Sequence, residues 1–201
     1  MIKKTQFIIA ILQLLPWLLF SQPKGHKNNF DNVVFIVKGD LNKDNLADSV
    51  VVTQDTLNNT YPYKLEIYFA KPDSKYVIGV ESDSAIEADF PLGKDGFRNG
   101  TGFLDITIAS GVLSINCELT RGHFEHKFRY QNGNFELVAF TQVYAGGTKV
   151  YTIDFNLSTG WLIKTTEATD SDKLFSRRRQ KLKIRPLPKL QNFKPFATNL
   201  F

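Results

Sequence analysis

The sequence predicts an all-β fold in which a meandering antiparallel sheet forms a sandwich or a partial barrel. Short runs of β-branched and aromatic residues, alternating with polar residues, recur along most of the chain. Turn residues separate these runs after every several positions, and such short connections favour antiparallel neighbours. Between residues 22 and 172 no segment has a convincing helical period.

Residues 1–21 have the features of an export signal. Two lysines precede an apolar stretch at residues 7–20. A membrane-spanning helix needs about 20 apolar residues, whereas this stretch is shorter and contains Gln13 and Pro16. We therefore expect a signal peptide, a mature protein without a transmembrane segment, and a periplasmic or secreted location.

Ten strands are expected in the body of the chain, residues 22–172. The clearest hairpin has Asn132-Gly133 at its turn, because both residues tolerate the positive φ of a tight turn. Asp170 or Ser171 can cap a short C-terminal helix that runs towards Arg179. The expected strands are residues 33–38, 49–54, 63–69, 76–81, 103–109, 112–119, 123–130, 135–142, 149–156 and 161–166.

The charge is unevenly distributed between the body and residues 173–201, the C-terminal tail. The body has 14 basic and 20 acidic residues, whereas the tail has nine basic residues and no acidic one. Such a tail can bind an anionic surface of the cell envelope. It can also pack on the acidic body, which we favour because the tail has the apolar anchors Leu187, Leu190, Phe193 and Phe196. Nucleic acid is not an expected partner of an exported protein.

The mature chain is long enough for one domain with a core of its own. Its single cysteine, Cys117, excludes an internal disulfide. We interpret Cys117 as a buried apolar residue of a strand rather than as a nucleophile.

Residues 40–48 place oxygen atoms at calcium-ligand spacing in a loop between two apolar runs. The side chains of Asp40, Asn42, Asp44 and Asp48 take positions 1, 3, 5 and 9, and the Leu46 carbonyl takes position 7. Ligands that are all oxygen favour calcium over zinc or copper. The expected ion is structural; the alternative is an ordinary polar turn, in which Asp and Asn are also common.

Residues 38–52 resemble the calcium-binding loop of FG-GAP and VCBS-type repeats. On that resemblance Asp40, Asn42, Asp44, Leu46 and Asp48 match the ligand positions. Asn45 stands where Gly is usual, and Asn tolerates the left-handed conformation. Only one copy is present, so the resemblance does not imply a propeller. Residues 106–160 are similar to a group of uncharacterised exported bacterial proteins, which implies a β architecture and no activity.

These observations favour an exported binding or structural module of the cell envelope with one structural calcium site. An envelope glycan would need a platform of exposed aromatic residues, for which Tyr61, Tyr63, Tyr144 and Trp161 are candidates. The alternative is a secreted hydrolase that uses a carboxylate pair, or His123 with Glu125, which share one face of a strand. The sequence does not decide whether the protein is an enzyme, and we favour a protein without enzymatic activity.

Overall fold

The computed structural model describes residues 29–98, 100, 102–171 and 173–195, and in this part of the chain the fold is all-β. The strands form two antiparallel sheets, and neither sheet closes into a barrel. Aromatic contacts join the sheets: the Phe35 and Tyr63 rings of one meet Phe103 of the other, and Phe69 meets Tyr130 and Phe135. The two sheets therefore pack face to face.

The small sheet has four strands in chain order, β1-β2-β3-β4. Each strand pairs with the next, because short loops join them. The strands are β1 (Asn32–Gly39), β2 (Asp48–Gln54), β3 (Tyr63–Ala70) and β4 (Tyr76–Ser82).

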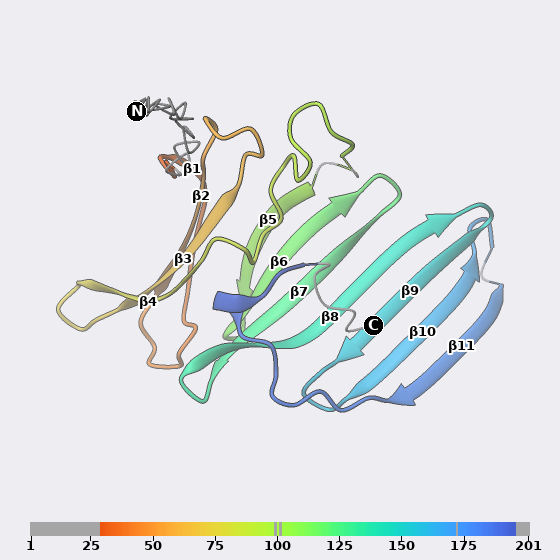
Figure 1. Ribbon diagram of the computed structural model, residues 1–201. Coiled ribbons are helices and arrows are strands. Elements are labelled where there is room, and N and C mark those ends of the chain that lie inside the picture. Colours follow the sequence, from red (N-terminus) through yellow and green to blue (C-terminus); the bar gives the residue numbers. More distant parts are fainter. Residues whose placement is uncertain (1–28, 99, 101, 172, 196–201) are drawn as a thin grey trace, which may run out of the picture.

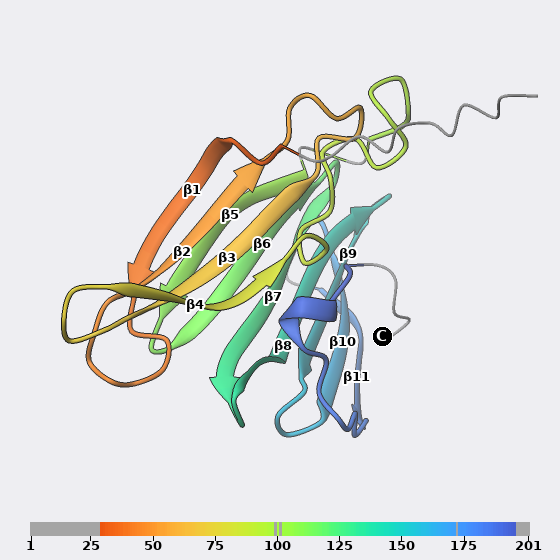
Figure 2. The same ribbon diagram turned by 60° about the vertical axis from the view of Figure 1, so that its left-hand side comes forward.

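The large sheet has seven strands, also in chain order, from β5 at one edge to β11 at the other. The small sheet lies over its β5 side, and strands β9 to β11 extend beyond that overlap (Figures 1 and 2). The strands are β5 (Gly102–Ala109), β6 (Val112–Leu119), β7 (Gly122–Gln131), β8 (Asn134–Gly146), β9 (Lys149–Asn156), β10 (Trp161–Ala168) and β11 (Leu174–Lys181).

The ten strands expected from the sequence are all present, with ends that shift by a few residues. The hairpin at Asn132-Gly133 is confirmed, with φ values of 53° and 71° at its two turn residues. The C-terminal helix was wrong: Leu174–Lys181 form strand β11, whose backbone pairs with β10 from Trp161 to Glu167. Pairing with the otherwise open edge of β10 satisfies more backbone groups than a single short helix would.

The core lies between the sheets and contains alternate residues of each strand, as the pleat requires. Cross-strand neighbours on this inner face of the large sheet include Ile115, His126, Phe140, Phe155 and Leu162. All five are buried. Cys117 also lies here, 3% exposed, in agreement with its interpretation as a buried strand residue.

After β11 the chain runs past the β9–β10 turn and then lies over β8 as residues 182–195, here called the C-terminal strap (Figure 1). The Leu137 N–H donates to the Pro188 carbonyl at 2.8 Å, and the Ser84 hydroxyl donates to the Phe193 carbonyl at 3.0 Å. A single 3-10 turn, η1 (Leu190–Asn192), contacts β4 and β8. The strap thus joins the two sheets.

The expected anchors Leu187, Leu190 and Phe193 are buried, and Phe196 lies outside the described residues. None of the ion pairs between described side chains involves residues 173–195. The strand pairing of β11 and the buried apolar side chains of the strap hold this segment on the domain.

The expected signal peptide, residues 1–21, lies outside the described residues. Among the residues that are described, no helix has the length and apolar character needed to cross a membrane.

Candidate functional site

The inner face of the large sheet is covered near β5 to β7 and becomes open towards one end of strands β9 to β11. Residues directly opposite each other in paired strands share a face, so the register extends the core row of Phe124 to Gln142, Ile153, Lys164 and Arg178. Phe124 is buried, whereas Lys164 and Arg178 are exposed. The small sheet and the strap therefore cover the Phe124 end of this row and leave the end with Lys164 and Arg178 open to solvent.

The next row on the same face contains an aromatic pair. Tyr144 lies opposite Tyr151, and Tyr151 lies opposite Thr166. The two tyrosine rings stack with centroids 4.8 Å apart, and Tyr144 is 38% exposed. We call these two rows together the open platform; its members used below are Gln142, Tyr144, Tyr151, Lys164, Thr166 and Arg178.

The open platform carries the positive charges of Lys164 and Arg178. Lys164 and Arg178 are cross-strand neighbours, and neither is in an ion pair with another described side chain. The stacked tyrosines, an amide and two cations thus face solvent side by side. Aromatic faces, amides and cations are the groups that bind sugar rings, hydroxyls and acidic substituents.

Beside the platform lies a groove made of two adjoining cavities. One has a volume of about 340 Å³ and the other of about 450 Å³. Phe97 and Leu119 line both, so the two cavities adjoin. The smaller is lined mainly by apolar side chains, including Phe103 and Phe124. The larger reaches Gln142 and Tyr144 of the platform and includes Arg121 at the β6–β7 turn.

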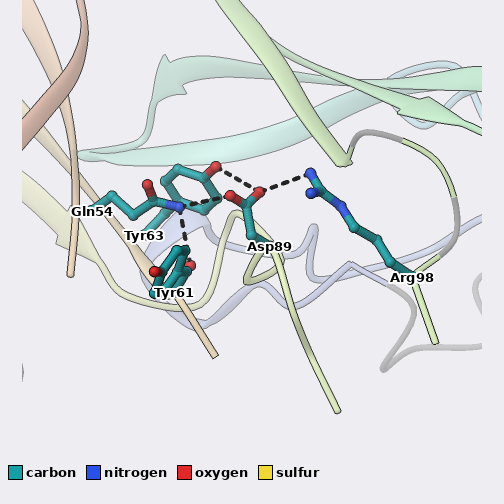
Figure 3. A network of polar contacts seen from close by, with 5 residues as sticks. All are labelled: Gln54, Tyr61, Tyr63, Asp89 and Arg98. Carbon is teal, nitrogen blue, oxygen red and sulfur yellow. Dashed lines mark hydrogen bonds and ion pairs between the residues drawn. The ribbon is translucent and has the colours of Figure 1, made fainter. Parts of the chain in front are cut away.

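The loop at residues 89–98, here called the roof, borders this groove. A network of hydrogen bonds connects the two ends of the roof (Figure 3). The Asp89 carboxylate accepts hydrogen bonds from the Gln54 amide at 3.0 Å, the Tyr63 hydroxyl at 2.8 Å and the Arg98 guanidinium at 3.2 Å. The Gln54 amide also donates to the Tyr61 carbonyl at 3.3 Å. These bonds tie Asp89 and Arg98, at the two ends of the loop, to each other and to β2 and β3 of the small sheet.

Burial changes the acidity of three groups around the network and the groove. It raises the pKa of Cys117 to about 12, and the nearby charges of Glu87 and Asp105 act in the same direction. The thiol is therefore protonated at neutral pH and is not a nucleophile. Desolvation also raises the pKa of the Glu87 carboxyl at the groove wall, and burial with the Asp89 hydrogen bond raises the pKa of Tyr63.

The loop at residues 40–48 is organised by its own side chains. The Asp40 carboxylate accepts from the backbone N–H groups of Lys43, Asp44 and Asn45 at 2.6 to 3.2 Å. The Asn42 amide donates to the Asp44 carboxylate at 2.9 Å. Lys43 and Asn45 have φ values of 68° and 65°, so the chain turns sharply twice here.

Asp48 has a different role from the other acidic residues of this loop. It is fully buried, and its two carboxylate oxygens accept from the N–H groups of Leu41 and Ala70 at 2.9 and 3.0 Å. Asp48 thereby ties both ends of the loop to strand β3. Asp40, Asn42 and Asp44 remain at the surface side of the loop, where oxygen ligands of a hard cation would be needed.

Within the described ranges, no three His, Cys, Asp or Glu side chains converge as a metal centre. The calcium shell of Asp40, Asn42, Asp44, Leu46 and Asp48 stays a prediction. Its donor chemistry suits calcium, but Asp48 already uses both oxygens in backbone hydrogen bonds.

The residues named for a hydrolase lie away from the groove. His123 is exposed, and on strand β7 both it and Glu125 alternate with the buried Phe124 and His126, so they face outward. Glu125 forms an ion pair with Lys127 at 3.0 Å. Neither His123 nor Glu125 lines either cavity of the groove.

Of the four aromatic residues expected to form a platform, only Tyr144 lies on it. Tyr63 is 5% exposed and donates to Asp89. The Tyr61 ring packs on Phe90 beneath Lys94. Trp161 lies on the outer face of the large sheet, with the Arg179 guanidinium 3.7 Å from its ring centroid.

Comparison of the chain with models of protein families, with curated proteins and with solved structures found no match.

Sequence reasoning missed the main groove residues, Phe97, Arg121 and Gln142. One signal was available for Phe97, because a large aromatic residue is unusual in a glycine-rich connection such as residues 93–102. Arg121 and Gln142 gave no local signal, because only the pairing of β7 with β8 brings them together.

Proposed function

We propose that this protein is an exported binding module of the cell envelope, and that it binds an acidic glycan on the open platform. The observation that carries the proposal is the continuation of the core face, past its cover, into stacked Tyr144 and Tyr151 beside the exposed cations Lys164 and Arg178. Sugar rings pack on exposed aromatic faces, and carboxylates pair with cations.

Two further features support an extracellular binding role. The first 21 residues match an export signal in sequence. In addition, the platform lies on strands rather than on loops, and side chains on rigid strands keep a fixed spacing for a repeating ligand.

The test uses isothermal titration of oligogalacturonate, an acidic glycan, and of a neutral galacto-oligosaccharide. The acidic glycan should bind more tightly, and its dissociation constant should rise with salt because screening weakens ion pairs at the surface. Tyr144→Ala should weaken binding about tenfold. The control Tyr76→Ala removes a similarly exposed ring from β4 on the other sheet and should change nothing.

Variants of the two platform cations test whether glycan binding depends on their charge. Lys164→Gln and Arg178→Gln should remove the preference for the acidic glycan. Arg177→Gln, one residue away on the opposite face of β11, should keep it. Equal affinity for the acidic and the neutral glycan would refute the platform as the binding site. So would a preference for the acidic glycan that is lost only in Arg177→Gln. If a broader glycan array also shows no ligand, the function itself is wrong.

The loop at residues 40–48 is proposed to take a structural calcium ion, chiefly through Asp40, Asn42 and Asp44. Melting curves with calcium, magnesium and chelator test this. At about 1 mM calcium and a dissociation constant of about 0.1 mM, the expected gain is on the order of 1.4 kcal/mol. Asp40→Ala and Asp44→Ala should abolish the calcium shift.

Asp48→Ala separates the structural role of this residue from metal binding. It leaves the N–H groups of Leu41 and Ala70 without acceptors, so it should lower the melting temperature in chelator as well as in calcium. A melting temperature that calcium does not change in the unmodified protein rules the metal out.

A further inference from the structure

The lining of the groove beside the platform suits an apolar molecule. Its smaller cavity is bounded by Phe97, Phe103, Cys117, Leu119 and Phe124. Phe97 at the roof is 76% exposed, and neighbouring Leu92 is 75% exposed. The Asp89 network ties the two ends of this loop together, and both apolar side chains face solvent. Large exposed apolar groups beside a cavity are typical of a ligand site.

The two ends of the groove differ in charge. The smaller cavity has the carboxyl groups of Glu87 and Glu118 at its wall. The larger cavity has Arg121, together with the neutral Thr120 and Gln142. Arg121 is in no ion pair with another described side chain. An anionic group is therefore repelled at the first end and attracted at the second.

We propose that the groove binds a straight-chain fatty acid. The hydrocarbon chain lies under Phe97 and along Leu119, with its methyl end towards Phe103 and Phe124. The carboxylate lies at Arg121, the only end of the groove whose charge suits it. Binding is non-covalent, because the one thiol at the wall is protonated and buried. This site is distinct in chemistry from the acidic glycan site, although Gln142 and Tyr144 border both.

A series of fatty acids from hexanoate to dodecanoate, titrated calorimetrically into the purified protein, tests the apolar part. Affinity should rise about fourfold for each added methylene group, the factor expected for burying one such group, and should level off once the groove is full. Phe97→Ala should weaken decanoate binding about tenfold. Because Phe97 is mostly exposed, this variant should still fold. Phe175→Ala, an exposed phenylalanine on β11, is the matched control.

The orientation is tested at the charged end. Arg121→Ala should weaken decanoate about fivefold and leave decanol unchanged, since only decanoate carries a charge. Arg177→Ala, an exposed arginine on β11, should affect neither ligand. An affinity that does not depend on chain length overturns the proposal. So does decanoate binding that survives both Phe97→Ala and Arg121→Ala.

The outcome does not depend on the glycan proposal. Lys164→Gln and Arg178→Gln remove the charges of the platform but none of the groove lining, so decanoate binding should persist in them. Binding of oligogalacturonate without any binding of decanoate would refute the groove alone. The reverse result would refute the platform alone.

Discussion

The half-buried Asp89 and the buried His126 are two polar side chains that differ in their hydrogen bonds. The Asp89 carboxylate is satisfied by three donors from three different segments. The buried His126 is surrounded by the rings of Phe124, Phe140 and Phe193, and its Nδ1 atom has no hydrogen-bond partner among the residues that the structure describes. A buried polar group without a partner is costly, and an imidazole reduces that cost by staying neutral.

We predict that His126 makes the protein sensitive to acid. Burial lowers the pKa of His126 from 6.5 to about 3. Below pH 6.5 the unfolded chain binds a proton at this residue and the folded chain does not, so stability falls as the pH falls from 6.5 towards 3. The loss is roughly 1.4 kcal/mol for each pH unit in this window, or about 2 kcal/mol at pH 5.

Urea unfolding at pH 7 and pH 5 measures this effect in His126→Phe. The variant should lose about 2 kcal/mol less than the unmodified protein between the two pH values. Comparing two pH values cancels any change in packing that the larger ring causes. His123→Phe, on the exposed face of the same strand, should keep most of the pH dependence. If His126→Phe and the unmodified protein lose equal stability, the histidine is not buried in its neutral form.

Among the elements, the β7–β8 hairpin shows where local sequence decides the structure. Asn132 and Gly133 both have positive φ, and the space beside Gly133 is empty to beyond 4 Å. Gly133→Ala should therefore destabilise through the backbone alone, by about 1 kcal/mol. Asn132→Gly should change stability by less than about 0.5 kcal/mol, because glycine also accepts this conformation. Chemical denaturation of both variants checks the prediction, and a neutral Gly133→Ala would contradict it.

Strand β11 shows where local sequence does not decide. Leu174–Lys181 contain leucine, arginine, glutamine and lysine, all good helix formers. The same residues form a strand because the edge of β10 offers a full set of backbone partners. The intrinsic preference of these residues for a helix is weak compared with the backbone hydrogen bonds of strand pairing. The strands with alternating patterns could be predicted from the sequence, whereas this one depended on the rest of the sheet.

The candidate sites divide in the same way. The loop at residues 40–48 is contiguous, so its ligand spacing could be read directly from the sequence. Tyr144 could be proposed as a surface aromatic residue, but its partner Tyr151 is defined only by the β8–β9 register. The groove brings residue 97 of a loop next to residues 119 and 142 of two strands. No spacing rule in the sequence connects these positions.

At the scale of the whole molecule, the C-terminal strap determines how far the inner face is covered. It runs from β11 past the β9–β10 turn and over β8 to the small sheet (Figure 2). Phe155 and Leu162, which lie outside the reach of the small sheet, are nevertheless buried. Further along the same strands, Ile153 is half-buried and Lys164 is exposed. The strap thus separates the core from the open platform, and its position defines the edge of the proposed glycan site.

We predict that Phe193 is the residue that fastens the strap. The centroid of its ring lies 4.8 Å from that of His126 and 5.3 Å from that of Phe128, and its carbonyl accepts from the Ser84 hydroxyl, just after β4. Phe193→Ala removes the buried ring but keeps the carbonyl, and it should destabilise the protein by about 3 to 5 kcal/mol. Phe175→Ala, which removes an exposed ring from β11, should cost much less.

Hydrogen exchange distinguishes a detached strap from a general loss of stability. The Leu137 N–H bonds to the Pro188 carbonyl of the strap, whereas the backbone of Val50 lies in the middle of the small sheet between β1 and β3. If the strap opens as a unit, Phe193→Ala should speed exchange at Leu137 far more than at Val50. Equal acceleration at both sites would mean that the strap and the two sheets unfold together, so that the boundary of the platform cannot move without loss of the whole fold.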